Sequence, residues 1–137
     1  MFALVLSVMD SYTDPDISSS ALGTIDTRCD TLDGQPFEIP GTTAELPSMQ
    51  RLLEKFRSAG KPIVHIVRIY KRDGLNVDLF RRAALQRDAN ILIAGSEGCQ
   101  LADGLLPEKG VKLDDELLIS GGTQSISEKE VVMYKPR

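Results

Sequence analysis

The chain has 137 residues, of which 42% are hydrophobic and 26% charged, with a net charge of −4. This composition is typical of a single folded domain with a sizeable core, and it excludes a disordered chain. The sequence has no basic stripe, and we interpret the cluster of Lys71-Arg72 and Arg81-Arg82 as a solvated face. We therefore expect no nucleic-acid partner.

The two cysteines and the first nine residues provide information about the cellular location of the protein. Cys29 and Cys99 show no CxxC spacing and no secretory context, which predicts free thiols in a reducing cytoplasm. The opening MFALVLSVM is apolar but lacks the basic region of a leader peptide, and it ends at Asp10. It is also too short to cross a bilayer, so we expect no membrane partner.

The first half of the chain predicts an extension, a strand and a helix. Residues 1–20 differ from the rest and are interpreted as an N-terminal extension of one domain over residues 21–137. Residues 21–26 predict a short buried strand that ends at Asp26. Helical spacing predicts a helix that ends near Gly60, from the positions of Leu46, Met49, Leu52, Leu53 and Phe56.

The second half predicts three further strands and one short helix. The β-branched run at residues 63–69 predicts a parallel strand that is covered on both faces, and 90–94 predict a short extended piece. Residues 117–120 and 130–134 are also read as strands. The expected helix covers residues 77–86, with Asn76 as a possible cap and a shared face of Val77, Phe80 and Ala84.

This order of elements predicts an α/β fold, with helices on both faces of a mostly parallel sheet in three α/β/α layers. Chemistry in such sheets collects beyond the carboxyl ends of the strands. Asp26 and Lys135 both occupy that position. We expect their two strands to be neighbours and the two side chains to lie close together.

The segment ALGTIDTRCDTLDG resembles the first strand of the isochorismatase-like cysteine hydrolases. LLEKFRSAGKPIVHIVRIY is similar to the first helix and second strand of that family. RDGLNVDLFRR, GSEGCQL and KEVVMYKPR continue the resemblance in the same order, over roughly residues 21–137. The resemblance implies a three-layer α/β hydrolase that cleaves a C–N or ether bond in a small molecule. It also implies Asp26 and Lys135 as two members of an Asp–Lys–Cys triad.

The third member of that triad has no counterpart in this sequence. In the family the nucleophilic cysteine follows the lysine on a later strand-to-helix turn, whereas only two residues follow Lys135 here. We expect the chain to match only the amino-terminal part of such a hydrolase and to be truncated after the strand that ends at Lys135. Cys29, near Asp26, and Cys99, at a possible helix start, are alternatives as ordinary free thiols or as substitute nucleophiles.

A metal or cofactor site is not expected. Some nicotinamidase-type relatives bind a metal through an Asp and several His, but His65 is the chain's single histidine and lies in the middle of a predicted strand. We interpret it as a packed core residue. The GSEG turn lacks the length and the lysine of a phosphate loop.

Two functions remain open. One is a hydrolase whose cysteine comes from a second polypeptide or a longer gene product, which the DNA downstream of codon 137 would reveal. The other is an inactive truncated homologue that acts as a binding or oligomerising module. Because nothing follows the apolar strand at 131–134 to pair with it, we expect a homo-oligomer or a marginally folded chain rather than a stable monomer.

Overall fold

The computed structural model describes residues 17–85 and 90–136. Residues 1–16, most of the expected extension, lie outside the described part. Within it, β1 (Leu22–Ile25), β2 (Ile63–Val67) and β4 (Glu130–Tyr134) confirm three of the predicted strands. The helix α1 (Thr42–Ser58) confirms the predicted helix, and two short 3-10 helices flank β1 at Ile17–Ser19 and Cys29–Thr31.

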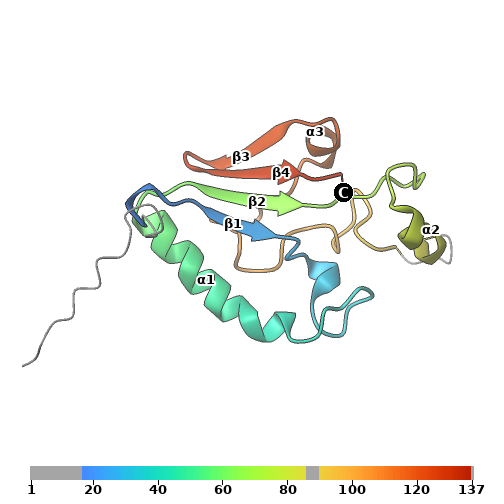
Figure 1. Cartoon of the computed structure of the whole chain (residues 1–137), viewed down its shortest axis with the longest axis horizontal. Helices are drawn as coiled ribbons and strands as arrows, with labels where there is room; N and C mark the ends of the chain where they lie inside the picture. Colours follow the sequence, from blue (N-terminus) through green and yellow to red (C-terminus); the bar gives the residue numbers. More distant parts are fainter. Residues whose placement is uncertain (1–16, 86–89, 137) are drawn as a thin grey trace, which may run out of the picture.

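The strands form one mixed sheet in the order β1-β2-β4-β3, where β3 covers Thr123–Ser127. β2 pairs in parallel with both β1 and β4, and β3 pairs antiparallel with β4. The three parallel strands therefore end at the same edge of the sheet, where Figure 1 also shows the C terminus and the helix α2 (Leu79–Leu85). This edge is the place where a site is expected in an α/β fold.

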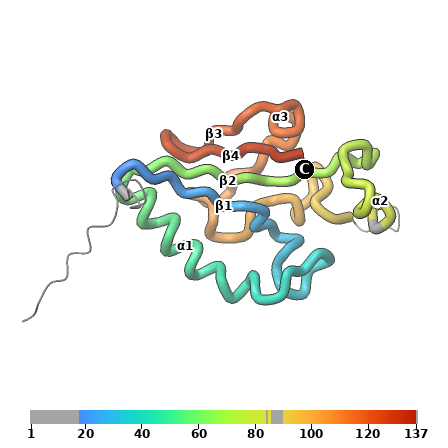
Figure 2. Tube along the Cα trace, viewed as in Figure 1, coloured from blue at the N-terminus to red at the C-terminus, as the bar shows by residue number. Residues whose placement is uncertain are grey.

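One face of the sheet carries most of the core. Leu53 of α1 packs with Ile63 of β2 and with Leu105 of the long connection that follows α2. Further along the same face, Val67 and Val132 pack in a second cluster with residues of that connection and of α3 (Asp115–Ile119). Figure 2 shows α1 running along the sheet before the chain enters β2.

The end of α1 confirms the role predicted for Gly60. This residue has φ 61, a left-handed conformation that glycine adopts at little cost, and its N–H donates to the carbonyl of Arg57. The next N–H, of Lys61, donates to the carbonyl of Phe56 at 2.9 Å. This paired closure satisfies carbonyls that the helix end would otherwise leave open.

Four local predictions are wrong or incomplete. Residues 117–119 form the end of α3 and residue 120 is its C-cap, so no strand forms there, because the Asp114 side chain accepts from the N–H of Leu117 and caps a helix. Asn76 does not cap α2, because its side-chain amide is hydrogen-bonded to the backbone of the preceding loop. Phe80 is 76% exposed, so it shares no buried face with Val77. Residues 90–94 make a single parallel bridge, Tyr70 with Ile93, in place of a strand.

Two expectations about the sheet are also wrong. The strands that end near Asp26 and Lys135 are not neighbours, because β2 lies between β1 and β4. The outer edge of β4 is not bare, since β3 pairs along it with a bulge between Ser125 and Ser127. The predicted template for strand-to-strand association is therefore absent at β4.

The opposite face of the sheet is more open within the described residues. Ile25 is 59% exposed and Met133 is 45% exposed, and Ile66 is their shared neighbour in the strand register. None of the described helices is long and apolar enough to cross a membrane.

Candidate active site at the carboxyl end of the sheet

Asp26 and Lys135 are held at the same edge of the sheet by backbone hydrogen bonds to the strand between them. The N–H of Asp26 donates to the carbonyl of Ile66 at 3.0 Å, and the N–H of Lys135 donates to that of Val67 at 2.9 Å. Their side chains meet across β2, with Lys135 Nζ at 2.5 Å from Asp26 Oδ2. The prediction that the two residues lie close together is confirmed. Both side chains are about one third exposed, at 32% for Asp26 and 28% for Lys135.

The backbone of Asp26 adopts an unusual conformation. Its φ of 56 lies in the left-handed region, which aspartate tolerates better than most residues but still at some cost. Its second carboxylate oxygen, Oδ1, is buried without a hydrogen-bond partner among the described residues. Strained backbone and an unsatisfied buried acceptor are both more frequent at functional sites than elsewhere.

A second ion pair lies at the same edge. Arg68, the residue after β2, donates through Nη1 to Asp78 Oδ2, and Arg81 lies 4.0 Å from the same oxygen. Arg68 Nε is buried and has no partner in the described part of the chain. The charges of Arg68 and Asp26 also interact. Sequence reasoning missed this pair, although an arginine directly after a buried strand was a signal for it.

Neither cysteine is an activated thiol. Burial raises the pKa of Cys99 to about 12, because desolvation outweighs the attraction of the adjacent Arg28 guanidinium. Cys99 lies in the turn after GSEG and not at a helix start, so the expected stabilisation of a thiolate is absent. Burial, together with the nearby carboxylates of Asp103 and Glu97, also raises the pKa of Cys29. Both thiols are therefore protonated near neutral pH and are poor nucleophiles.

Arg28 explains why Cys99 is buried where it is. The Arg28 side chain is fully buried, and its guanidinium donates to the carbonyls of Gln100 and Arg68 and to Cys99 Sγ. It therefore ties the loop after β1 to the end of β2 and to the long connection. This arrangement supports the strand ends on which Asp26 and Arg68 sit.

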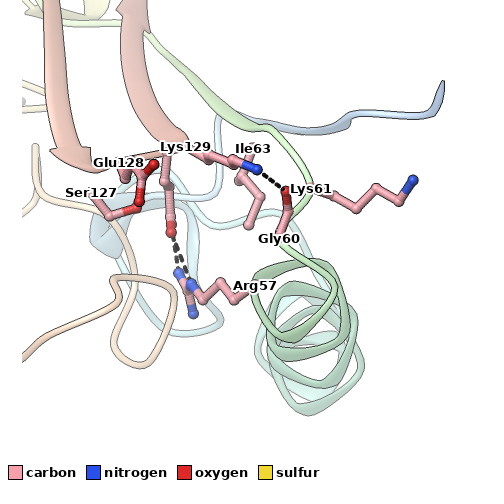
Figure 3. Close-up of a pocket in the computed structure, with 8 residues that line it drawn as sticks. Arg57, Gly60, Lys61, Ile63, Ser127, Glu128 and Lys129 are labelled. Atoms are coloured by element: carbon pink, nitrogen blue, oxygen red, sulfur yellow. Dashed lines mark hydrogen bonds and ion pairs between the residues drawn. The ribbon is translucent and has the colours of Figure 1, made fainter. Parts of the chain in front are cut away.

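A buried polar network crosses the other half of the sheet. His65 is fully buried, as predicted, and its Nε2 lies 2.7 Å from Glu130 Oε1, while its Nδ1 lies 2.7 Å from Thr24 Oγ1. Arg57 donates from Nε and Nη2 to the two oxygens of Glu130. Figure 3 shows Arg57 reaching from the last turn of α1 toward the strands, at a pocket of about 310 Å³ that Ser127 and Lys129 help to line.

The network fixes the protonation states of its members. The carboxylate of Glu130 can only accept, so His65 carries its proton on Nε2 and Nδ1 accepts from the hydroxyl of Thr24. Burial lowers the pKa of His65 more than the carboxylate raises it. Burial alone would raise the pKa of Glu130, but hydrogen bonds from Arg57 and His65 hold it below its usual range.

This network makes stability depend on pH. Because the pKa of His65 is lower in the folded chain, the unfolded chain binds an extra proton below about pH 6.5. The free energy of unfolding is therefore expected to fall as the pH drops from 7 to 5, by at most about 1.4 kcal/mol per pH unit. Glu130 acts in the same direction at lower pH. Urea denaturation at a series of pH values measures this slope.

The control uses the fact that the chain has one histidine. The His65→Gln variant should lose the slope between pH 7 and 5, while Glu and Asp titration below that range persists. A wild-type stability that is constant between pH 7 and 5 would contradict the neutral, buried state of His65.

A metal centre is not formed by the part of the chain that the structure describes. No group of three or more His, Cys, Asp or Glu side chains in it could hold a metal ion. The charged groups at the carboxyl end of the sheet instead form ion pairs. Such an arrangement suits proton transfer and the binding of a polar small molecule.

Comparisons with known proteins point to one family. No family model matches the chain. A probable inactive nicotinamidase from Arabidopsis thaliana is 31% identical over 90 residues, which are 64% of this chain and 46% of that protein. Among solved structures, an isochorismatase family protein from Desulfovibrio vulgaris is 29% identical, with a TM-score of 0.61 over 69% of this chain and 50% of that one.

A cysteine hydrolase from Pseudomonas syringae has the same fold, with a TM-score of 0.61 and 16% identity over 85% of this chain and 46% of that protein. The mixed, mostly parallel sheet thus has the α/β fold of the isochorismatase-like proteins. The chain is similar in sequence and fold to proteins of the isochorismatase-like cysteine hydrolase family. It spans about half the length of the relatives it matches.

Proposed function

We propose that the chain carries the Asp–Lys part of the active site of an isochorismatase-like hydrolase, which cleaves a C–N or ether bond in a small molecule. The observation that carries this proposal is the ion pair of Asp26 and Lys135, formed across an intervening strand at the carboxyl edge of the sheet. Asp26 and Lys135 are far apart in the sequence, and they come into contact because β1, β2 and β4 pair in one sheet. The similarity to a hydrolase family supports the same function.

The proposed roles follow from the chemistry of the two groups. Asp26 accepts the proton of a thiol, and the ammonium of Lys135 favours the charged sulfur that results. The thiol itself belongs to a segment beyond the residues of this chain, because Cys29 and Cys99 are both held protonated. The small-molecule substrate would bind over the same edge.

A second candidate function is an inactive module that binds or oligomerises. Two observations favour it: the absence of an activated thiol in this chain and the similarity to a relative described as a probable inactive nicotinamidase. The open sheet face around Ile25 and Met133 offers a surface for association. In such a module, the ion pair of Asp26 and Lys135 would have a structural role and no catalytic one.

The test is a gain-of-function experiment. The purified chain alone is expected to show no turnover of simple amides or ethers that iodoacetamide abolishes. A hybrid protein would join the full chain to the part of the Desulfovibrio vulgaris relative that lies beyond the matched half. We expect this hybrid to hydrolyse at least one member of the panel, with loss of activity on alkylation. A hybrid that folds cooperatively but lacks activity on the panel would favour the inactive module.

A further inference from the structure

A hollow of about 560 Å³ lies between the loop after β2 and the start of α2, and the residue that follows Lys135 helps to line it. Its volume is within the range of small-molecule sites. Pro136, the residue after Lys135, forms part of its wall, and so does Asp78, which pairs with Arg68. Two of its lining residues are therefore neighbours of charged residues at the candidate active site: Pro136 follows Lys135 in the chain, and Asp78 pairs with Arg68.

The hollow has an apolar part that nothing in the described residues covers. Leu75, Leu79 and Phe80 line it, and their exposed fractions are 77%, 78% and 76%. Three large apolar side chains exposed to this extent within six residues form an unusual surface for a soluble domain. Such a surface gains free energy when it contacts an apolar group.

The hollow also has one uncompensated positive charge. The carboxylate of Asp78 is already paired with Arg68 and lies near Arg81. Arg82 lines the hollow, is exposed, and has no side-chain hydrogen bond or ion pair with any described residue. Its guanidinium is free to bind a carboxylate with two hydrogen bonds.

The wall between these groups is held rigidly. The Asn76 side chain accepts from the N–H of Lys71 and donates to the carbonyl of Ile69 and to the hydroxyl of Tyr134. It therefore fixes the loop to Ile69, which lies two residues after β2, and to Tyr134 at the end of β4. A preformed wall reduces the entropy that a ligand must lose on binding.

The wall that Asp78 contributes to the hollow is supported by the buried side chain of Arg68. The residue is 8% exposed, and its Nε has no acceptor among the described residues, even though the same guanidinium is paired with Asp78 on the wall of the hollow. An unsatisfied buried donor costs about 1–3 kcal/mol unless a water molecule or ligand meets it.

We propose that this hollow is the subsite for the non-reacting part of the substrate, and that it selects a small organic acid with an apolar or aromatic group. The apolar group contacts Leu75, Leu79 and Phe80, the carboxylate pairs with Arg82, and the scissile bond faces Asp26 and Lys135. The inference rests on the proposed function for the identity of the ligand as a substrate, but the binding itself can be tested without turnover.

The test is a titration of the full chain with benzoate, followed by the backbone amide signals in NMR. Benzoate should cause saturable shifts in residues 75–80, with a dissociation constant in the millimolar range expected for so small a ligand. Benzamide, which keeps the ring and lacks the charge, should bind about fivefold more weakly. Acetate, which lacks the ring, should give no saturable shift.

Two variants make the test specific. Arg82→Gln should weaken benzoate binding about fivefold, and the matched control Arg51→Gln, on the exposed surface of α1, should leave it unchanged. Equal binding to wild type and Arg82→Gln, or no shift in residues 75–80, would overturn the proposal. Shifts of these signals with protein concentration in the absence of benzoate would assign the surface to self-association and would also overturn it. An inactive hybrid that still binds benzoate at residues 75–80 would reject the proposed function alone.

Discussion

The Asp26→Asn variant of the hybrid enzyme is expected to lose about 10²- to 10⁴-fold in kcat/KM, the usual contribution of a general acid–base group. Asparagine keeps the size of the side chain but cannot accept the proton of the thiol. Steady-state kinetics on whichever substrate the hybrid hydrolyses measures the loss. Iodoacetamide sensitivity should fall in parallel, because the thiol would remain protonated.

The stability of the same variant separates chemistry from folding. The ion pair with Lys135 is about one third exposed, so its loss should change the free energy of unfolding by no more than about 1 kcal/mol. Glu54→Gln, on the exposed face of α1, is the matched control and should affect neither quantity. If Asp26→Asn leaves kcat/KM at the level of the unmodified hybrid, Asp26 is not the base.

The Glu130→Ala variant is expected to be the most damaging to the fold. Glu130 is 1% exposed and accepts from Arg57 and His65, so its removal leaves a cation and an imidazole without their partner. Breaking a buried pair in this way costs about 3–5 kcal/mol, a large fraction of a domain's net stability of about 5–15 kcal/mol. The midpoint of urea denaturation measures this loss.

The neighbouring Glu128→Ala variant provides the control, since Glu128 is exposed and makes no such contact. It should change the free energy of unfolding by less than about 0.5 kcal/mol. Equal midpoints for the Glu130→Ala and Glu128→Ala variants would show that the network contributes little to stability.

The sequence predicted the elements whose local pattern is strong. β2 was identified from its run of β-branched residues, and α1 from apolar residues at helical spacing. β3 was missed because TQSIS is mostly polar and sits on the sheet edge, where little burial marks its pattern. The LLIS run was misread as a strand, because a short apolar run does not separate a strand from a buried helix turn.

The residues of the candidate site also fall into two groups, those that the sequence predicted and those that it did not. Asp26 and Lys135 could be predicted, because each directly follows a recognisable strand. The network of Arg57, His65 and Glu130 could not, since only the register of β2 and β4 brings these residues together. A buried acid at the start of an apolar strand was the available signal. The Arg68–Asp78 pair likewise depends on a loop conformation that the sequence pattern does not encode.

Because β2 lies between the strands that carry Asp26 and Lys135, the ion pair needs a long side chain. Adjacent strands lie about 4.8 Å apart, so Asp26 and Lys135 project from backbones about 10 Å apart, and only a long side chain can close that distance. The lysine reaches its partner because β4 is held in one register, which the bulged hairpin with β3 sets. A slip of β4 by one residue would turn Lys135 to the opposite face of the sheet. A deletion within residues 125–127 could therefore disconnect the ion pair while leaving both of its residues in the sequence.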